Sequence, residues 1–296
     1  MWISKTIREA NQRRAVLKGH VGLVPTMGAL HDGHLLHIQR CRALADHVLV
    51  SIFVNPTQFG PQEDFDSYPR PIKDDLATCA SAGVDGVFWP NTHQMYPPQR
   101  IAINFNIPIL ATILEGQFRP TYFAGVCHVV CKLFNILKPD IATFGCKDYQ
   151  QLKIIEALVA DLAMPVQIVP IKTVRDPDGL ALSSRNAYLD AAARCRALGL
   201  SKALHHAQTL IEREGQTEPT VVERAMSDIL LAHQMVIDYA VVRHPRTLGK
   251  LDVINPAKPG GVVALAAGRV GHVRLIDNLL IAANRSPMPI STRPLA

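Results

Sequence analysis

Up to about residue 171, the chain alternates short, continuous apolar runs with longer segments of helical character. A strand that is apolar along its whole length is typical of a parallel sheet covered by helices on both faces. Because crossovers between parallel strands are right-handed, this alternation predicts a Rossmann-like, doubly wound α/β domain. The predicted strands are 21–24, 48–54, 84–89, 140–145 and 166–171, and the predicted helices are 6–18, 34–45, 72–82, 121–137 and 147–163.

The pattern changes near residue 173. A long loop leads into two helical stretches that reach His233, and short strand-like runs follow at 236–242, 260–268 and 273–281. This order predicts a smaller α+β cap domain. The expected division is 1–173 for the Rossmann-like domain, 174–285 for the cap and 286–296 for a flexible tail.

Composition argues against several classes of protein. The 31 Lys and Arg residues exceed the 25 Asp and Glu residues, but they form no long basic run, so the charge favours anionic small substrates over nucleic acid. The six cysteines form no C-x-x-C pair and are expected to be reduced thiols. No secretory signal and no stretch of about 20 apolar residues is found, so we expect a cytoplasmic protein without a membrane partner.

Polar loops follow four of the predicted strands. They are PTMGALHDGH, NPTQF, CKDYQQ and KTVRDPDGLALSSRN. In a doubly wound sheet, ligands bind beyond the carboxyl ends of the strands. We therefore expect these four loops to meet at one crevice.

The first of these loops places His31 and His34 three residues apart at the expected beginning of a helix. The N-terminus of a helix offers unpaired N–H groups and a partial positive charge, so it can bind an anion. Two imidazoles in its first turn could donate hydrogen bonds to phosphate oxygens. The alternatives are a pair of surface histidines and a zinc site, for which helical ligands are usually four apart and a third ligand is missing.

The stretch VPTMGALHDGH resembles the H-x-G-H signature of the nucleotidyltransferase superfamily. SIFVNPTQF, YPRPIKDDL, FGCKDYQQL and GLALSSRNAYL follow it in an order and spacing similar to those of the pantothenate synthetase (pantoate–β-alanine ligase) family. RLIDN at 274–278 extends the resemblance into the predicted cap. Two positions depart from the family pattern, because Cys146 replaces the usual Glu and Tyr122 a common His.

This resemblance implies the ATP-dependent condensation of pantoate with β-alanine to pantothenate. The pantoate carboxylate would attack the α-phosphorus of ATP to give pantoyl adenylate and pyrophosphate, and β-alanine would then displace AMP. The resemblance also implies Mg²⁺ and a homodimer. Pantoate, β-alanine and ATP are the expected partners, without nucleic acid.

The resemblance also assigns roles to individual residues. The catalytic groups would be His34, His31, Lys147 and Arg185. The ATP site would comprise Met27, Gly28, His31, His34, Gly145, Lys147, Asp148, Val174, Leu182, Ser183, Ser184 and Arg185. Pantoate would contact Pro25, Met27, Gln58 and Gln151, and Asp74 would be associated with Mg²⁺. Val174 and the run from Leu182 to Arg185 would belong to a mobile loop that closes over the triphosphate.

Two other functions stay open at this point. One is a different H-x-G-H enzyme, an adenylyltransferase that leaves AMP on its product. The other is a nucleotide- or RNA-binding protein that kept the fold without the chemistry. Cys127 and Cys131, with His128 between them, could belong to a metal site, although core packing is the favoured interpretation.

Overall fold

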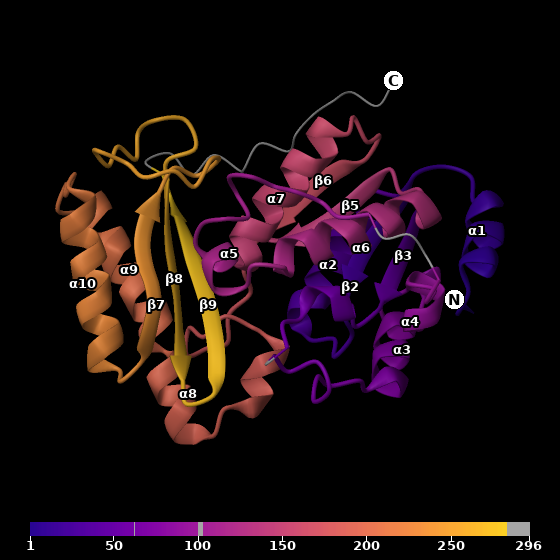
Figure 1. Ribbon diagram of the computed structural model, residues 1–296, viewed down its shortest axis with the longest axis horizontal. Helices are drawn as coiled ribbons and strands as arrows, with labels where there is room; N and C mark the ends of the chain where they lie inside the picture. Colours follow the sequence, from indigo (N-terminus) through magenta and orange to yellow (C-terminus); the bar gives the residue numbers. More distant parts are fainter. Residues whose placement is uncertain (62, 100–102, 283–296) are drawn as a thin grey trace. The chain divides into compact units, whose positions relative to one another are not determined.

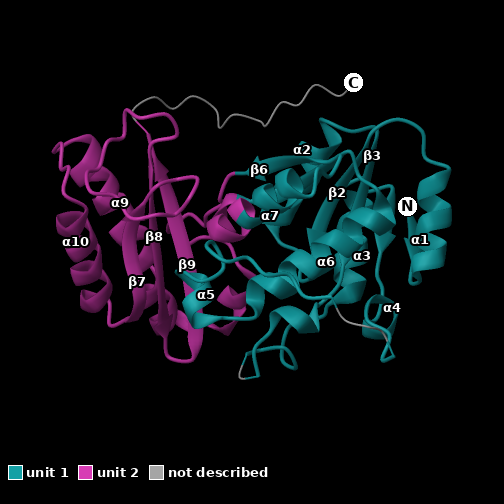
Figure 2. Ribbon diagram, turned by 45° about the horizontal axis from the view of Figure 1, so that its top comes forward, with its two compact units in different colours: residues 1–145, 154–171, 290–296 teal, residues 146–153, 172–289 magenta. Residues whose placement is uncertain are grey.

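The computed structural model describes residues 1–61, 63–99 and 103–282 (Figure 1). The predicted tail at 286–296 and the last three residues of the predicted cap lie outside the described residues. The chain forms two compact units (Figure 2): unit 1 contains 1–145 and 154–171, and unit 2 contains 146–153 and the described residues from 172 onward. The predicted functional division between 173 and 174 stays a prediction.

Unit 1 is built on a six-stranded parallel sheet with the order β1-β4-β3-β2-β5-β6. The strands are β1 (Trp2–Ser4), β2 (Val21–Thr26), β3 (His47–Ile52), β4 (Gly86–Phe88), β5 (Ile141–Gly145) and β6 (Gln167–Ile171). The chain extends from β2 toward β3 and β4 on one side and later toward β5 and β6 on the other. The strand order therefore reverses beside β2, and the predicted doubly wound, Rossmann-like fold is confirmed.

Helices cover both faces of this sheet. The helices between β1 and β6 along the chain are α1 (Ile7–Ala15), α2 (Asp32–Arg42), α3 (Ile72–Ser81), α4 (Thr92–Met95), α5 (Glu115–Phe118), α6 (Tyr122–Leu137) and α7 (Tyr149–Asp161), and the 3-10 turns are η1 (Pro56–Gln58) and η2 (Cys146–Asp148), the latter in unit 2. Ile38 of α2 and Cys79 of α3 pack in one apolar cluster with Val24 of β2. The adjacent Leu23 is also fully buried, and α6 contacts β2, so this strand is covered on both faces.

The structure differs from the sequence prediction at two strands. β1 was not predicted, because three residues at the edge of a sheet leave little pattern to detect. β2 continues through Pro25, where the prediction began a loop. Thr26 accepts a hydrogen bond from the Phe53 amide on the β3 side, so Pro25 directs its missing donor toward β5, whose pairing with β2 ends at Leu23.

Unit 2 contains a three-stranded antiparallel sheet, β7-β8-β9, and the predicted α+β character is confirmed. Its elements are the turn η3 (Ser184–Tyr188), α8 (Ala191–Ala197), α9 (Gly199–Glu212), α10 (Pro219–Ala232), β7 (Val236–Arg243), β8 (Val262–Val270) and β9 (Val273–Ile281). One buried apolar cluster contains Leu204 of α9, Met226 of α10, and Ala264 and Ala266 of β8. In the described part of the chain, no helix is both long and apolar enough to cross a membrane.

Gly125 of α6 provides a test of how tightly the site-bearing turn η1 is held. A Cβ at this position would come within 2.2 Å of the Thr57 carbonyl oxygen. Alanine normally stabilises a helix interior relative to glycine by about 1 kcal/mol, but here we expect Gly125→Ala to destabilise the protein by about 1–3 kcal/mol through overpacking. Urea unfolding measures the difference. Asn135→Ala, at an exposed position of the same helix, is the control, and an unchanged or raised stability in Gly125→Ala would contradict the packing described.

Candidate functional site

The predicted site residues are divided between the two units. Unit 1 contains Pro25, Met27, Gly28, His31, His34, Gln58, Asp74 and Gly145. Unit 2 contains Lys147, Asp148, Gln151, Val174, Leu182, Ser183, Ser184 and Arg185. Each unit therefore presents its own group of polar side chains.

The turn between β2 and α2 has an unusual backbone conformation. Gly28 and Ala29 have φ angles of 84° and 51°, in the left-handed region that disfavours a residue with a side chain. The carboxylate of Asp75 on α3 accepts hydrogen bonds from the Ala29 amide at 3.0 Å and the Leu30 amide at 2.8 Å. Asp75 is almost fully buried. Since charge-assisted hydrogen bonds are strong, we infer that Asp75 holds this turn in place.

His31 and His34 hydrogen bond reciprocally to the backbone at the beginning of α2. His31 is the N-cap residue, and its Nδ1 accepts from the Gly33 amide at 3.2 Å. The Nδ1 of His34 accepts from the His31 amide, also at 3.2 Å. These bonds form a capping box in which two imidazoles take the places usually held by Ser or Thr and by Glu or Gln. Their ring centroids lie 4.2 Å apart.

The capping box also determines the form of both rings. An Nδ1 that accepts an amide hydrogen cannot carry a proton, so each neutral ring has its hydrogen on Nε2. Desolvation lowers the pKa of His34 well below its ordinary value, and the neighbouring His31 and His37 lower it further. His34 is therefore neutral at physiological pH. It can donate a hydrogen bond through Nε2, but it does not supply a positive charge.

Gln58 is positioned by a buried polar network around Asn55. The Asn55 Nδ2 donates to the Gln58 Oε1 at 2.9 Å, and its Oδ1 accepts from the Tyr96 hydroxyl at 2.8 Å. Gln58 in turn directs its Nε2 toward the Met27 Sδ at 3.2 Å. The structure thus brings together Gln58 and Met27, two of the residues predicted to contact pantoate.

The departure from the family pattern at Tyr122 lies beside Gln58. The guanidinium carbon of Arg119 is 3.6 Å from the centroid of the Tyr122 ring. Arg119 forms a bidentate ion pair with Glu63, with distances of 2.7 and 2.6 Å, and donates to the Gln58 carbonyl oxygen at 3.2 Å. Tyr122 therefore supports an arginine that fixes the backbone of η1.

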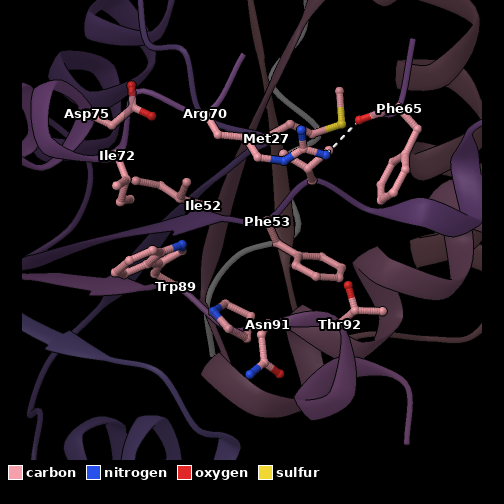
Figure 3. A pocket seen from close by; sticks show the side chains of 12 residues that line it. Met27, Ile52, Phe53, Phe65, Arg70, Ile72, Asp75, Trp89, Asn91 and Thr92 are labelled. Atoms are coloured by element: carbon pink, nitrogen blue, oxygen red, sulfur yellow. Dashed lines mark hydrogen bonds between the residues drawn. The ribbon is translucent and has the colours of Figure 1, made fainter. Parts of the chain in front are cut away.

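A pocket of about 330 Å³ lies next to Met27, at the carboxyl ends of β3 and β4 (Figure 3). Its lining is mainly apolar and aromatic: Met27, Ile52, Phe53, Val54, Phe65, Arg70, Ile72, Asp75, Trp89, Pro90, Asn91 and Thr92. The Arg70 guanidinium donates to the carbonyl oxygens of Phe65 and Tyr68 at 2.6 and 2.9 Å. Because Met27 also contacts Gln58, it forms a wall shared by the pocket and the polar network.

The adjacent acids Asp74 and Asp75 lie in different environments. Asp74 is exposed in the first turn of α3, whereas both carboxylate oxygens of Asp75 accept backbone hydrogen bonds. No group of three or more His, Cys, Asp or Glu that could hold a metal ion occurs in the described part of the chain. A lone accessible carboxylate fits a Mg²⁺ ion held mainly by phosphate oxygens and water. The role of Asp74 stays a prediction.

The thiols Cys127 and Cys131 belong to the α6 region rather than to a ligand cluster. Cys127 is fully buried, and desolvation raises its pKa to about 12. Burial also raises the pKa of Cys131. Because a metal ligand must be a thiolate, these environments disfavour metal binding and favour packing.

In unit 2, residues 174–182 form a small hairpin. The Leu182 amide donates to the Val174 carbonyl oxygen at 2.9 Å, and Arg175 pairs with Ala181 in an antiparallel bridge. The hairpin leads directly into η3, whose N-cap Ser183 accepts from the Arg185 amide at 3.3 Å. Val174 and Leu182 of the predicted closing loop are thus joined by a backbone hydrogen bond. Ser184 and Arg185 begin the turn that follows.

The other predicted residues of unit 2 lie at the start of α7. Lys147 and Asp148 belong to η2, with 3.4 Å between the Lys147 Nζ and the Asp148 Oδ1. Gln151 is in the first turn of α7. Cys146 is buried, so it contributes little exposed polar surface at this position.

Sequence reasoning missed three residues that position the site of unit 1. Asn55, Asp75 and Arg119 each contact a predicted residue or the turn that carries it. Asn55 precedes a proline and caps η1, which is a detectable local pattern. Nothing near Arg119 in the sequence indicates its contact with Gln58, because the two are far apart along the chain.

Comparisons with known proteins agree in one assignment. A family model described as pantoate-beta-alanine ligase matches residues 3–280. A pantothenate synthetase of Acidothermus cellulolyticus is 45% identical over 277 residues, which cover 94% of this chain and 90% of that protein. A pantothenate synthetase of Magnetococcus marinus is 44% identical, with 96% of this chain and 99% of that protein covered.

Solved structures give the same result. A pantothenate synthetase from Thermus thermophilus has a TM-score of 0.89 and 41% identity, covering 95% of this chain and all of its own. A pantoate-beta-alanine ligase from Francisella tularensis, complexed with beta-gamma ATP and beta-alanine, has a TM-score of 0.78 and 33% identity. It covers 95% of this chain and 97% of its own.

The capping box predicts that His34 has a structural role that a glutamine can replace. His34→Ala removes the acceptor for the His31 amide, and we expect it to lower the free energy of unfolding by about 1 kcal/mol. His34→Gln keeps an acceptor at the position where Gln is common in capping boxes, so stability should return close to that of the wild type. Chemical denaturation of the three proteins measures this, and equal losses in both variants would contradict the role of the capping box.

Asp75 and Asp74 form a matched pair for a second test. Asp75→Asn removes the charge and one acceptor from the turn, and we expect a loss of about 1.5–3 kcal/mol in the free energy of unfolding. Asp74→Asn, one residue away at an exposed position, should change stability by less than about 0.5 kcal/mol. The measurement is urea unfolding at low Mg²⁺. If the two variants are equally stable, Asp75 does not hold the turn.

Proposed function

The chain belongs to the pantoate–β-alanine ligase family and joins pantoate to β-alanine at the expense of ATP, and we propose that it does so through pantoyl adenylate formed at the β2–α2 turn. The observation that carries this proposal is the capping box of His31 and His34 at the N-terminus of a helix. It combines the partial positive charge of a helix N-terminus with two imidazole donors whose Nδ1 atoms already accept hydrogen bonds from the backbone. Such a site favours an anion without neutralising it by proton transfer.

In the first step, the pantoate carboxylate attacks the α-phosphorus of ATP and pyrophosphate leaves. Negative charge develops on the phosphate oxygens during this displacement, and preorganised donors are most effective where charge develops. We assign His34 to the oxygens of the reacting phosphate and His31 to a neighbouring phosphate. Lys147 and Arg185 of unit 2 supply the positive charge that the two neutral histidines lack.

Pantoate binding is assigned to Pro25, Met27, Gln58 and Gln151. The Asn55 network supports this role for Gln58, because it fixes the side-chain amide beside the Met27 thioether. A neutral amide can donate to the carboxylate and accept from a hydroxyl without repelling the nucleophile. Positioning of the two reactants then accounts for much of the rate, since no covalent enzyme intermediate is needed.

Residues around the nucleotide are assigned in the same way. Gly28 and Gly145 allow close approach of the backbone, Asp148 binds the ribose hydroxyls, and Asp74 would hold Mg²⁺ together with the phosphates. The bound ion would neutralise phosphate charge. The remaining ATP contacts come from the hairpin and the turn after it: Val174, Leu182, Ser183, Ser184 and Arg185.

The second step needs an amine and an acyl carbon in contact. The uncharged amine of β-alanine attacks the carbonyl carbon of pantoyl adenylate, the C–O bond to AMP breaks, and pantothenate forms. We propose that 1–173 binds ATP and pantoate and that 174–285 closes over them to exclude water, which would otherwise hydrolyse the adenylate. We also propose a cytoplasmic homodimer without nucleic-acid or membrane partners.

An omission assay tests the reaction. With ATP, Mg²⁺, pantoate and β-alanine present, AMP, pyrophosphate and pantothenate should form in equal amounts. Without β-alanine, one equivalent of pyrophosphate per site should form in a burst, and without pantoate none of the three products should appear. AMP formation that does not depend on pantoate would contradict the assignment. A product that retains AMP in the presence of β-alanine would indicate an adenylyltransferase instead.

The His34 variants separate structure from chemistry in the same assay. His34→Gln keeps the capping box, but its amide does not occupy the position of the imidazole Nε2, so adenylate formation should fall about 100-fold or more. ATP affinity should change much less, because the partial positive charge of the helix N-terminus and the charged side chains of unit 2 remain. Equal losses in affinity and rate would point to a role in binding alone.

A further inference from the structure

The RLIDN motif at 274–278 lies in β9 of unit 2 and has no role in the reaction as assigned above. Its last two residues, Asp277 and Asn278, are both buried. The pairing of β9 with β8 is regular through this region, so the two adjacent side chains point to opposite faces of the sheet. Two buried polar side chains on one strand require partners on both of its faces.

Asn278 binds the backbone of η2. Its Nδ2 donates to the Cys146 carbonyl oxygen at 2.9 Å and to the Lys147 carbonyl oxygen at 2.7 Å. The two hydrogens of one amide thus hold two successive peptide groups. Since these bonds flank the Cα of Lys147, they restrict the direction in which its side chain leaves the backbone.

Asp277 binds the base of the hairpin. Its carboxylate accepts from Arg175 in a bidentate pair, at 2.6 Å to Nη1 and 3.0 Å to Nη2. Arg175 also donates to the Gly179 carbonyl oxygen at 3.2 Å, across the hairpin. The Asp277 side chain is 2% exposed and that of Arg175 is 19% exposed. A buried ion pair gains little net stability but defines a geometry, so its value lies in fixing this junction.

We propose that Asp277 and Asn278 are positioning residues that hold the two phosphate-binding parts of unit 2 on one rigid strand. Asn278 directs Lys147, and Asp277 acts through Arg175 on the hairpin that leads to Arg185. This inference rests on the proposed roles of Lys147 and Arg185. It assigns to β9 a function in adenylate formation beyond its place in the core.

A second ion pair in the same sheet provides a matched control. Asp238 of β7 accepts from the Arg274 Nε at 2.6 Å, and the two side chains are 8% and 18% exposed. The carboxylate of Asp238 joins β7 to Arg274 of β9, so this acid belongs to the sheet and not to the hairpin or η2. A purely structural role for Asp277 would make its loss equivalent to the loss of Asp238.

A double-mutant cycle of Asn278→Ala and Lys147→Ala tests whether Asn278 positions Lys147. Single-turnover pyrophosphate release, with ATP and pantoate saturating, reports adenylate formation. We expect Asn278→Ala to slow this step about 10- to 100-fold, because small misplacements of a positioned group have effects of this size. Lys147→Ala should slow it at least as much, and the double variant should be no slower than Lys147→Ala alone.

Three results of this cycle would overturn the inference. A wild-type rate in folded Asn278→Ala would exclude a positioning role, and losses that multiply in the double variant would mean that Asn278 does not act through Lys147. A wild-type rate in Lys147→Ala would remove the proposed function of Lys147 itself, and the inference with it.

Asn278→Ser keeps one hydroxyl donor and should retain more activity and a higher melting temperature than Asn278→Ala. It therefore tests the positioning of Lys147 in a variant that loses less stability.

A comparison of Asp277→Asn with Asp238→Asn tests whether Asp277 positions the hairpin. We expect both variants to melt at similar, lowered temperatures, since each weakens one partly buried ion pair of the same sheet. Of these two variants, only Asp277→Asn should lower kcat/KM for ATP, by about tenfold, because Asp277 and not Asp238 pairs with an arginine of the hairpin. If the two variants lose activity equally, or if Asp277→Asn keeps the wild-type value, Asp277 is a structural residue only.

Discussion

The hydrogen bonds that the His31 and His34 side chains accept from the backbone connect the proposed chemistry to the fold. They satisfy backbone donors at the beginning of α2, and they place the proton of each neutral ring on Nε2. A side chain that caps a helix is held in a fixed orientation, so the same contact that stabilises the helix also fixes the direction of the Nε2–H donor that the proposed mechanism assigns to phosphate. The lowered pKa of His34 keeps that donor uncharged.

Other contacts in unit 1 support the turn and two of the residues predicted to contact pantoate. Asp75 holds the left-handed turn before the histidines, and Asn55 holds Gln58 against Met27. Neither Asp75 nor Asn55 is assigned to a substrate, yet both are nearly inaccessible to solvent. In unit 2, the buried polar side chains of Asp277 and Asn278 have a similar supporting role. From one strand, they hold a hairpin and a turn. Preorganisation by buried polar groups is thus common to both units.

Much of the fold follows from the sequence because continuous apolar strands and helical segments leave few possible topologies. The position of the polar loops at the carboxyl ends of strands was predictable for the same reason, and so was the location of His31 and His34 at the beginning of a helix. The strand β1 could not be predicted, since it has only three residues and lies at the edge of the six-stranded sheet. The continuation of β2 through Pro25 depends on where β5 stops pairing, which is a tertiary property.

Sequence reasoning was less effective for the residues that support the site. Asp74 and Asp75 are identical and adjacent, and only the packing of α3 shows that Asp75 faces the turn while Asp74 faces solvent. Arg119 reaches Gln58 across a long separation in the chain. RLIDN could be recognised as a motif, but its partners in η2 and the hairpin became apparent only from the structure. Long-range contacts of this kind leave no local pattern.

The proposed reaction depends on the attack of a carboxylate on the α-phosphorus of ATP at the β2–α2 turn. The most direct test uses pantoate with a heavy-oxygen label in its carboxylate, turned over once by the wild-type enzyme with ATP and β-alanine, followed by mass spectrometry of the nucleotide and phosphate products. One labelled oxygen should be transferred to AMP, because the bond between the carboxylate oxygen and phosphorus survives when the amine displaces AMP. Unlabelled AMP, or label in inorganic phosphate accompanied by ADP, would contradict the proposed reaction.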